Sequence, residues 1–471
     1  MQTLSDFLYE YGLELKPHLT KNRILKVLQP LPKGFTLIPS FPLACFPNNN
    51  EVSKIRCDQC LGIKPLKTCS KCHKIFYCSS ECQTLSWKYH HKKLCSIYAN
   101  VEQGTNVDDD NDEKMEKEML RRVSLIISNY LENLKKKDFS KVKTIDERTL
   151  INNILCETFL SLMTHRDEQP QTKLENYRKT ASKVFAELKL TNLSEDDLIN
   201  FLCKFYCNNF SIHDYQIFTF GDGTYPIGAL INHSCRPNSI VMYDGEVQLI
   251  RTIEDISKGE EITISYNDIA IDKKSRQRIL REKHFFRLLT KIDLILEAGQ
   301  IIEETDDNRE ILKNWLMLQL AKDINLNLND TSKDEYVKSL DEFLTNLPLP
   351  DSLTHNPYSK LALSVSTQTF FEFIDSLEWN KASIIGKFIL AIYLLIYPRF
   401  HPVIGLHLFT LGKCIWNDST NNNEKVKQTV EILQLAKRVF EITHGVGDKN
   451  KEMIYEVDEL LIIAQNELKK N

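Results

Sequence analysis

The sequence lacks any apolar run long enough to cross a membrane. The best candidate, residues 388–397, falls short of the roughly 20 apolar residues that a spanning helix needs. The N-terminus lacks a basic segment followed by an apolar run, so we expect no secretory signal peptide. A large excess of one charge is also missing, because the formal net charge is -4. This balance argues against wholesale binding to nucleic acid or an anionic membrane. Because no signal peptide is expected, we expect a cytoplasmic protein, a nuclear one, or both.

Cysteine is distributed unevenly. The chain has 471 residues and thirteen cysteines, and seven of these fall between Cys57 and Cys95. At this length, with 42% hydrophobic and 26% charged residues, the chain is expected to form several globular domains. Because no export signal is expected, clustered cysteines favour metal ligation over disulfide bonds.

The spacing within this stretch is that of a metal module. The candidate ligands form two Cys-x2-Cys pairs and two pairs at positions i and i+4: Cys57/Cys60, Cys69/Cys72, Cys78/Cys82 and His91/Cys95. An i,i+4 spacing places both side chains on one face of a helical turn. Seven thiols and one imidazole supply the eight soft ligands that two tetrahedral zinc ions require. Spacing alone leaves open whether the pairs combine sequentially or interleave. No ligand position remains for water, which favours structural rather than catalytic zinc.

Lysines surround the candidate ligands. With the thiolates and two zinc ions counted, the module carries a charge of about +4. Such a basic surface could meet a partner, either a proline-rich peptide or DNA. The alternative is that the module only stabilises the fold.

The rest of the chain changes its periodicity along its length. Residues 24–28 and 33–38 predict two short strands joined by a turn at Pro30 and Pro32. Residues 103–118 indicate a solvated acidic loop that leads into a helix. Helical spacing follows over 119–202, with apolar residues Leu120, Val123, Ile127, Tyr130, Leu131 and Leu134. Strands are predicted at 212–220, 239–243, 247–253 and 261–266. After residue 271 the pattern is helical, with breaks near 325–330, 346–356 and 417–423.

A second group of residues lies in the strand-rich segment. Residues 228–238 read Gly-Ala-Leu-Ile-Asn-His-Ser-Cys-Arg-Pro-Asn, and 259–266 read Gly-Glu-Glu-Ile-Thr-Ile-Ser-Tyr. Taken singly, Tyr266 is more often a packed strand-end tyrosine, Asn232 a turn-former and His233 a satisfied buried histidine.

Together and in this order, the two segments resemble the SET domain of protein lysine methyltransferases. The cysteine-rich stretch, with Tyr77 before Cys78 and Trp87 after Cys82, resembles a MYND zinc finger. Its position between the first SET strands and the rest is the layout of the SET-and-MYND (SMYD) family. Further segments extend the resemblance over nearly the whole chain: 208–212, 258–261, 397–398, 401–402, 405, 411–413 and 443–445.

The resemblance implies an α+β multidomain fold. In it a β-rich SET core is split by a MYND zinc finger and a helical insert, and is followed by an all-α, TPR-like C-terminal domain. We expect residues 1–50 and 203–270 to form the two halves of the SET core. The MYND finger is expected at 51–100, the acidic loop and helical insert at 101–202, a degenerate post-SET segment at 271–295 and the helical domain at 296–471. We expect a monomer.

The resemblance also implies an S-adenosylmethionine-dependent N-methyltransferase that acts on lysine side chains of histone or non-histone protein. Tyr266 would direct its hydroxyl to the methyl-transfer site. Asn232 and His233 would bind the amine and adenine side of the cofactor, and Asn208 its amino-acid end. Two residues of the first loop and one aromatic complete the expected cofactor contacts: Lys21, Asn22 and Phe286.

In the MYND family the two zinc sites interleave. One ion would take Cys57, Cys60, Cys78 and Cys82. The other would take Cys69, Cys72, a histidine and Cys95. His91 keeps the His-x3-Cys spacing, whereas His90 keeps the family's usual distance from Cys82. We favour His91, because its helical geometry with Cys95 is the tighter constraint.

Two departures from the family pattern bear on activity. The first cofactor loop, glycine-rich in the family, reads Lys-Asn-Arg-Ile-Leu at 21–25 and contains no glycine. The post-SET cysteines are also missing, so no third zinc is expected beside Cys235. His284 replaces an aromatic of the lysine channel, and Phe285 and Phe286 are the candidate aromatic walls. The competing hypotheses are a scaffold of weak or lost activity that binds protein partners in transcriptional regulation, and a MYND adaptor without methyl chemistry.

Overall fold

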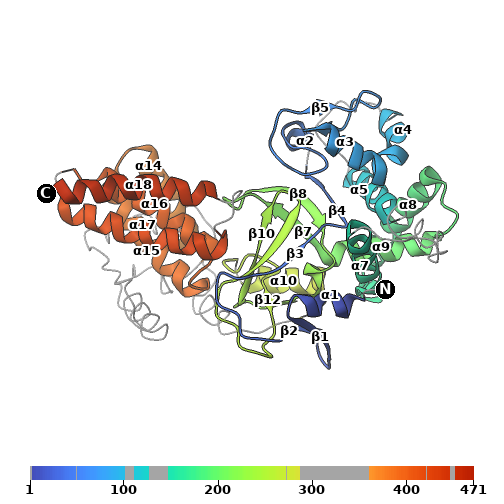
Figure 1. Ribbon diagram of the computed structural model, residues 1–471, viewed down its shortest axis with the longest axis horizontal. Coiled ribbons are helices and arrows are strands. Elements are labelled where there is room, and N and C mark those ends of the chain that lie inside the picture. The colour runs from blue at the N-terminus through green and yellow to red at the C-terminus, as the bar shows by residue number, and fades with distance from the viewer. Residues whose placement is uncertain are drawn as a thin grey trace.

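The computed structural model describes residues 3–48, 50–100, 111–126, 147–271, 273–286, 360–420, 422–445 and 451–470. A β-rich core lies in the middle of the molecule (Figure 1). The cysteine-rich module and a set of helices lie on one side of it, and a stack of C-terminal helices lies on the other. None of the helices in the described ranges has the length and apolarity that crossing a membrane requires.

The core is built from short strands that come from both sides of the cysteine-rich module. The strands in the described ranges are β1 (Leu13–His18), β2 (Asn22–Val27), β3 (Thr36–Ser40), β4 (Ala44–Pro47), β5 (Lys67–Thr68), β6 (Phe76–Tyr77), β7 (Asn209–His213), β8 (Thr219–Thr224), β9 (Asn232–His233), β10 (Ser239–Asp244), β11 (Val247–Thr252) and β12 (Thr263–Ile264). Early strands pair with late ones in the orders β10-β11-β3 and β4-β8-β7. The module and the helices after it therefore interrupt one core, as the sequence predicts.

Two local expectations needed correction. Strands β2 and β3 both form, but β2 pairs with β1 and β3 with β11 rather than with each other. The run 212–220 is two strands, β7 and β8. Between them the Asp214 carboxylate accepts hydrogen bonds from the backbone N–H groups of Gln216 and Phe218, which closes the turn. An aspartate in this position is the turn signal that the apolar pattern obscured.

A first group of helices precedes the C-terminal domain in the sequence. Those in the described ranges are α1 (Leu4–Glu10), α2 (Asn50–Ile55), α3 (Ser80–Ser86), the π-helical turn η1 (Trp87–His91), α4 (Lys92–Asn100), α5 (Asn111–Ile126), α7 (Glu147–Ser161), the short η4 (Arg166–Glu168), α8 (Gln171–Leu188), α9 (Glu195–Asn208), the short η5 (Gly228–Leu230) and α10 (Lys273–His284). Leu120 and Val123 of α5 are buried, as their spacing predicts. Helix α9 begins at a capping box formed by Ser194 and Asp197 and delivers Asn208 at its end.

The C-terminal domain stacks helices in sequence order. These are α14 (Lys360–Asp375), α15 (Trp379–Ile396), α16 (Pro402–Asn417), α17 (Asn423–Thr443) and α18 (Lys451–Lys470). A Cβ at Gly405 would lie 2.8 Å from the Phe440 ring, and one at Gly412 would lie 2.8 Å from Leu433. These two glycines of α16 therefore permit its close packing on α17. The break predicted near 417–423 is the connection between these two helices.

Several predictions fall outside the described residues. They are the apolar positions Ile127, Tyr130, Leu131 and Leu134, residues 103–110 of the acidic loop, and the breaks near 325–330 and 346–356.

The helical domain packs directly on the SET-like core. Ile269, which follows β12, belongs to the same apolar cluster as the C-terminal helices. The Tyr397 hydroxyl donates to the Asp268 carboxylate at 2.7 Å, and Nε2 of His444 lies 2.9 Å from the carbonyl oxygen of Tyr215. Segments 397–398 and 443–445, which carried some of the resemblance, thus lie where the two regions meet.

Candidate active site and metal clusters

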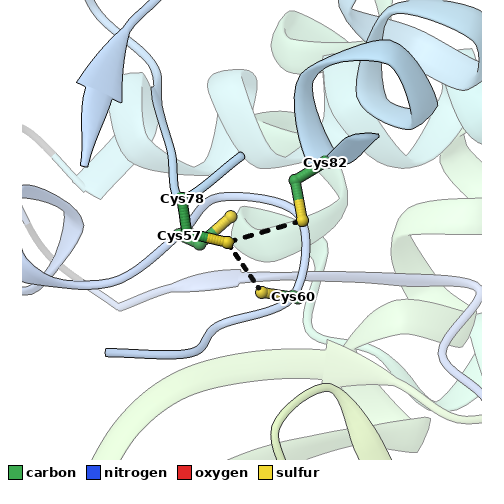
Figure 2. Close-up of side chains that lie close together, drawn as sticks. All are labelled: Cys57, Cys60, Cys78 and Cys82. Carbon is green, nitrogen blue, oxygen red and sulfur yellow. Dashed lines mark hydrogen bonds between the residues drawn. The ribbon is translucent and has the colours of Figure 1, made fainter. Parts of the chain in front are cut away.

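Four cysteine sulfurs converge in the first metal cluster. Figure 2 shows Cys57, Cys60, Cys78 and Cys82 pointing toward one another, with Cys82 delivered by α3. All four sulfurs lie within 4.8 Å of one another, and both Cys60–Cys78 and Cys78–Cys82 measure 3.6 Å. Zinc with Zn–S bonds of about 2.3 Å holds tetrahedral sulfurs about 3.8 Å apart. The spacing of the thiols therefore fits a zinc ion.

The second cluster combines the remaining three thiols with one imidazole. Its ligand atoms come from Cys69, Cys72, His91 and Cys95, again within 4.8 Å of one another, and all four residues are buried. Nε2 of His91 lies 3.3 Å from Sγ of Cys69 and 3.6 Å from Sγ of Cys72. The two clusters interleave along the chain, which is the arrangement that the MYND resemblance implies.

The structure brings His91, rather than His90, to these thiols. His90 turns its Nε2 to the Ser86 hydroxyl at 3.2 Å instead. Between Cys82 and Cys95 the helix contains the π-helical turn η1, which takes up one residue more than an α-helical turn. This extra residue explains why His91 can keep its spacing to Cys95 although it lies one position too far from Cys82.

A buried ion pair anchors the metal module to the helical insert. Asp58, next to Cys57, accepts from Nη1 of Arg121 at 2.6 Å, and its backbone carbonyl accepts from Nη2 at 2.8 Å. Burial would raise the pKa of Asp58, but the charge of Arg121 and the hydrogen bonds from His90 and Arg121 lower it to about 2. The carboxylate is therefore ionised, and it holds α5 against the module.

The second candidate site forms where β9 and β12 run side by side. These strands pair in parallel, with Asn232 opposite Thr263 and His233 opposite Ile264. Two motifs that lie some thirty residues apart in the sequence thus become neighbours, as the SET resemblance implies. The pairing places Tyr266, just beyond β12, next to His233.

His233 and Tyr266 form a rigid pair. The backbone N–H of Tyr266 donates to Nδ1 of His233 at 3.0 Å, so the neutral imidazole carries its proton on Nε2, which lies 3.2 Å from Sγ of Cys235. Burial and the nearby charge of Arg276 lower the pKa of His233 to about 4. The Tyr266 hydroxyl donates to the carbonyl of Ile231 at 2.7 Å, and burial raises its pKa to about 12. Both rings are therefore uncharged at neutral pH.

Asn232 is joined to the first loop through hydrogen bonds. Its side-chain Nδ2 donates to the backbone carbonyl of Arg23 at 2.7 Å and to Oε1 of Glu261 at 2.8 Å. The other oxygen of Glu261 lies 2.5 Å from Nζ of Lys21. Asn22 is the first residue of β2, directly after the turn from β1, and has a left-handed φ of 64°. Of these residues, Lys21 and Asn22 are exposed at the edge of the site.

Arg23 is a candidate site residue that the sequence did not reveal. Its Nη2 donates to the carbonyl of Ala229 at 3.2 Å, while its buried Nε has no hydrogen-bond partner among the described residues. Burial lowers the pKa of Arg23, and the Tyr266 hydroxyl is close enough to influence it. A partly satisfied, half-buried guanidinium suits an anionic group. Only an alternating strand pattern was visible at this position.

A cavity of about 800 Å³ opens beside Tyr266. One wall comes from the β-rich core, including Asn208 and Tyr266, and the other from the helical domain, including Phe370 and Tyr393. Asn208 is held by a hydrogen bond from its Nδ2 to the carbonyl of Lys204 at 2.8 Å. Of the residues predicted for the site, Asn208 and Tyr266 line this cavity, whereas Lys21, Asn22, Asn232, His233 and Phe286 do not.

The three ring-bearing residues at the end of α10, His284, Phe285 and Phe286, contact different parts of the protein. Phe286 lies near both rings of the rigid pair, with its centroid 5.9 Å from that of His233 and 6.3 Å from that of Tyr266. His284 is closer to Tyr266, at 4.6 Å. Phe285 instead stacks on His165 of the insert at 4.9 Å, so it is not a wall of the site beside Tyr266.

Comparisons with known proteins agree with this geometry. The SET domain family matches residues 60–267. Histone-lysine N-methyltransferase ASHR1 of Arabidopsis thaliana is 24% identical over 95% of both chains. Human histone-lysine N-methyltransferase SMYD3 is 25% identical over 89% of this chain and 91% of its own length, and human N-lysine methyltransferase SMYD2 is 30% identical over 58% of each.

Over most of its length the chain is similar to proteins of the SMYD family. Two departures from the family pattern can now be placed in the structure. Asn22 adopts the left-handed backbone that favours glycine, and asparagine is one of the few other residues that tolerate it. The first loop of this chain therefore makes a glycine-like turn without glycine.

Cys235 takes its place in the packing between the core and the helical domain. It is 1% exposed and belongs to the apolar cluster of the C-terminal helices. Its Sγ also lies 3.2 Å from Nε2 of His233, so it helps to fix the orientation of the imidazole.

Proposed function

We propose that this protein is an S-adenosylmethionine-dependent protein-lysine N-methyltransferase. The observation that carries the proposal is the rigid pair of His233 and Tyr266, which holds a neutral phenol at the wall of the cavity between the core and the helical domain. The match to the SET domain and the names of the similar proteins, which are histone-lysine and N-lysine methyltransferases, support it.

The chemistry requires positioning more than acid–base catalysis. A lysine amine has an ordinary pKa of about 10.4 and must lose its proton before its lone pair can attack a methyl group. The attack displaces the sulfur in line, so alignment of nitrogen, carbon and sulfur supplies much of the rate. When bound, the cofactor supplies the electrophilic methyl group. Tyr266, with its pKa raised to about 12 by burial, remains protonated and orients the amine through its hydroxyl oxygen.

Residues of this chain fit the amino-acid end of the cofactor. Nε of Arg23, which has no hydrogen-bond partner in the described part of the chain, can donate to a carboxylate. Lys21 supplies an ammonium that is already paired with Glu261, and Asn208 supplies an amide at the cavity wall. Lys21, Asn22, Asn208, Asn232, His233 and Phe286 are the proposed cofactor-binding residues, and Arg23 is added to them. The backbone groups of Asn232 and His233 would bind the adenine side of the cofactor, because the side-chain amide of Asn232 already donates to Arg23 and Glu261.

The two zinc ions have a structural role in this proposal. One is held by Cys57, Cys60, Cys78 and Cys82, and the other by Cys69, Cys72, His91 and Cys95. Each set already supplies four ligand atoms, so no position remains for a reactive water. The zinc ions therefore stabilise the MYND finger, whose basic surface is proposed to bind a proline-rich peptide.

The domain division expected from the sequence is retained within the proposal, with boundaries after residues 50, 100, 202, 270 and 295. Helix α9 continues across position 202 to Asn208, so the insert and the C-terminal half of the SET core are joined by a continuous helix. We also propose that the protein is a monomer located in the cytoplasm, the nucleus or both.

One observation favours a second function, that of an interaction scaffold with weak or lost activity. The side-chain amide of Asn232 donates both of its hydrogen bonds within the protein, to Arg23 and Glu261. If these bonds persist, this side chain has no N–H left for a cofactor. Binding of S-adenosylmethionine distinguishes the two functions directly.

The deciding experiment combines calorimetry with a methylation assay. Purified zinc-loaded protein is titrated with S-adenosylmethionine, and labelled cofactor is then offered with a panel of histones and with whole-cell lysate. We expect binding and transfer to protein lysine, while Tyr266→Phe retains cofactor affinity and loses most transfer. A folded protein that binds no cofactor would rule out the enzyme and leave the scaffold.

A further inference from the structure

Asp268 lines the cavity two residues beyond Tyr266, and it is exposed rather than buried. One carboxylate oxygen, Oδ1, accepts hydrogen bonds from the Tyr397 hydroxyl at 2.7 Å and from the backbone N–H of Ala270 at 3.0 Å. The other oxygen, Oδ2, has no hydrogen-bond partner among the described residues and is not one of their buried unsatisfied atoms. The carboxylate is therefore held in a fixed orientation, with one accessible oxygen left for a ligand.

Asp268 is the one acidic side chain among the described residues that line this cavity. Lys283 also lines it, but the carboxylate close enough to influence the pKa of Lys283 is that of Asp222. Burial lowers the pKa of each imidazole on the wall, so all of them are neutral at neutral pH: His213, His284, His401 and His407. No cation of the described wall is paired with Asp268, so this part of the cavity attracts a positively charged group.

Two tyrosine rings of the helical domain lie beside this carboxylate. Tyr397, which donates to Asp268, has its ring centroid 5.6 Å from that of Tyr393, and Tyr393 lines the cavity. Burial raises the pKa of Tyr393, and the nearby charge of Asp268 adds to this rise. A planar guanidinium pairs with a carboxylate through two N–H groups and also stacks on aromatic faces, whereas an ammonium is a compact, strongly hydrated charge. A carboxylate beside aromatic rings therefore suits arginine better than lysine.

We propose that Asp268, with Tyr393 beside it, binds an arginine side chain of the protein substrate and so selects lysines that have an arginine nearby. This inference rests on the proposed methyltransferase function. Tyr266 marks the place of methyl transfer, and an extended chain advances about 3.3 Å per residue, so the arginine should lie within about three residues of the target lysine. Asp268 is thus a specificity-determining residue that contacts the substrate away from the reacting atoms.

The test varies the residues around a target lysine. A protein that the lysate assay identifies as methylated is prepared with arginine, glutamine or glutamate at each position within about three residues of that lysine. Wild type should favour the best arginine form over its glutamine counterpart about tenfold in kcat/KM, chiefly through KM, because a hydrogen bond to a charged group is worth at least this factor. This comparison needs no variant of the enzyme.

Two substitutions then assign the preference to Asp268. Asp268→Asn is nearly isosteric and keeps Oδ1 for Tyr397 and Ala270, but it removes the charge, so the preference for arginine should disappear. Asp268→Lys should reverse it and favour the glutamate form.

Tyr397→Phe separates recognition from a structural role of the carboxylate. It removes the hydrogen bond to Asp268 and keeps the charge, so it should retain the preference for arginine even where it lowers the melting temperature. Equal kcat/KM of wild type for the arginine and glutamine forms, or an unchanged preference in Asp268→Asn, would overturn the inference. If Asp268→Lys fails to fold, Asp268→Asn still decides. Absence of any transfer by wild type in the lysate assay would instead reject the methyltransferase function itself.

Discussion

Arg121 clamps Asp58 with both terminal nitrogens of its guanidinium, at 2.6 Å to the carboxylate and 2.8 Å to the backbone carbonyl. Each residue is only 7% exposed. Asp58 belongs to the metal module and Arg121 to α5 of the helical insert, 63 residues later. The structure of the zinc finger is therefore coupled to the insert by a desolvated ion pair.

Breaking this clamp should be costly. Arg121→Met leaves an ionised Asp58 buried without its partner, which should lower the free energy of unfolding by about 3–5 kcal/mol in urea titrations. The double variant Asp58→Asn with Arg121→Met removes both charges and should recover some of the loss. A loss below about 1 kcal/mol in the single variant would mean that water or another cation reaches Asp58.

The choice of zinc histidine can be tested by metal content. Wild type should contain two zinc ions per chain by elemental analysis. His91→Ala removes an imidazole whose Nε2 lies 3.3 Å from Cys69, so it should lower the content toward one. His90→Ala is the matched control, because His90 bonds to Ser86 rather than to the thiols, and it should retain two. The reverse result would assign the ligand to His90.

The ligand pairs were predictable because their geometry is local. A Cys-x2-Cys pair and an i,i+4 pair each bring two side chains together within one turn. The spacing to Cys95 also favoured His91 over His90, and His91 is the histidine that lies among the thiols. The π-helical turn at Trp87–His91, which accommodates the extra residue after Cys82, has no signal in the sequence. The Asp58–Arg121 clamp was not predictable either, since periodicity carries no information on which distant side chains meet.

The active site likewise has parts that the sequence predicted and parts that it did not. The pairing of β9 with β12 agrees with the resemblance, and it fixes the positions of His233 and Tyr266. Phe285 was predicted as an aromatic wall of the site, but it stacks on His165 and does not line the cavity. Arg23 was missed, since its role depends on burial and on an Nε that has no partner within the described ranges, which only the folded structure reveals.

The left-handed turn at Asn22 leads to a prediction on stability. Asn22→Ala should destabilise the β1–β2 hairpin by about 1–2 kcal/mol, because a Cβ-bearing residue without a polar side chain is strained at a φ of 64°. Asn22→Gly should be as stable as wild type or slightly more stable. Thermal denaturation compares the two variants, and equal melting temperatures would show that the hairpin relaxes to another turn.

Stability should fall in mild acid because of buried histidines such as His407. Its Nε2 lies 2.7 Å from the Gly386 carbonyl, and burial lowers its pKa from 6.5 to about 4. The unfolded chain takes up this proton near pH 6.5 and the folded chain only near pH 4. Between these values His407 alone should reduce the free energy of unfolding by about 1.4 kcal/mol for each unit of falling pH.

His407→Gln isolates this contribution. Glutamine can still donate to the Gly386 carbonyl but does not titrate. The difference in unfolding free energy between variant and wild type should therefore grow in favour of the variant as the pH falls from 6.5 toward 4. A difference that does not change with pH would show that His407 becomes protonated in the folded protein without penalty.

Arg251 should control the contact between the two walls of the cavity. From β11 its Nε donates to the Ile442 carbonyl at 3.0 Å and its Nη2 to the Glu441 carbonyl at 3.2 Å, so a cation sits at the C-terminal end of α17. Arg251→Ala leaves these buried carbonyls without donors and should lower the free energy of unfolding by about 3 kcal/mol. Lys33→Ala removes an exposed ion pair with Asp255 within the core and a cation–π contact with Phe400 of the helical domain, and should cost less than about 1 kcal/mol. The helical domain supplies one wall of the cavity. Arg251→Ala should therefore also raise KM for a protein substrate while leaving S-adenosylmethionine affinity close to wild type. Equal effects of Arg251→Ala and Lys33→Ala on KM would mean that the helical wall is held in place without Arg251.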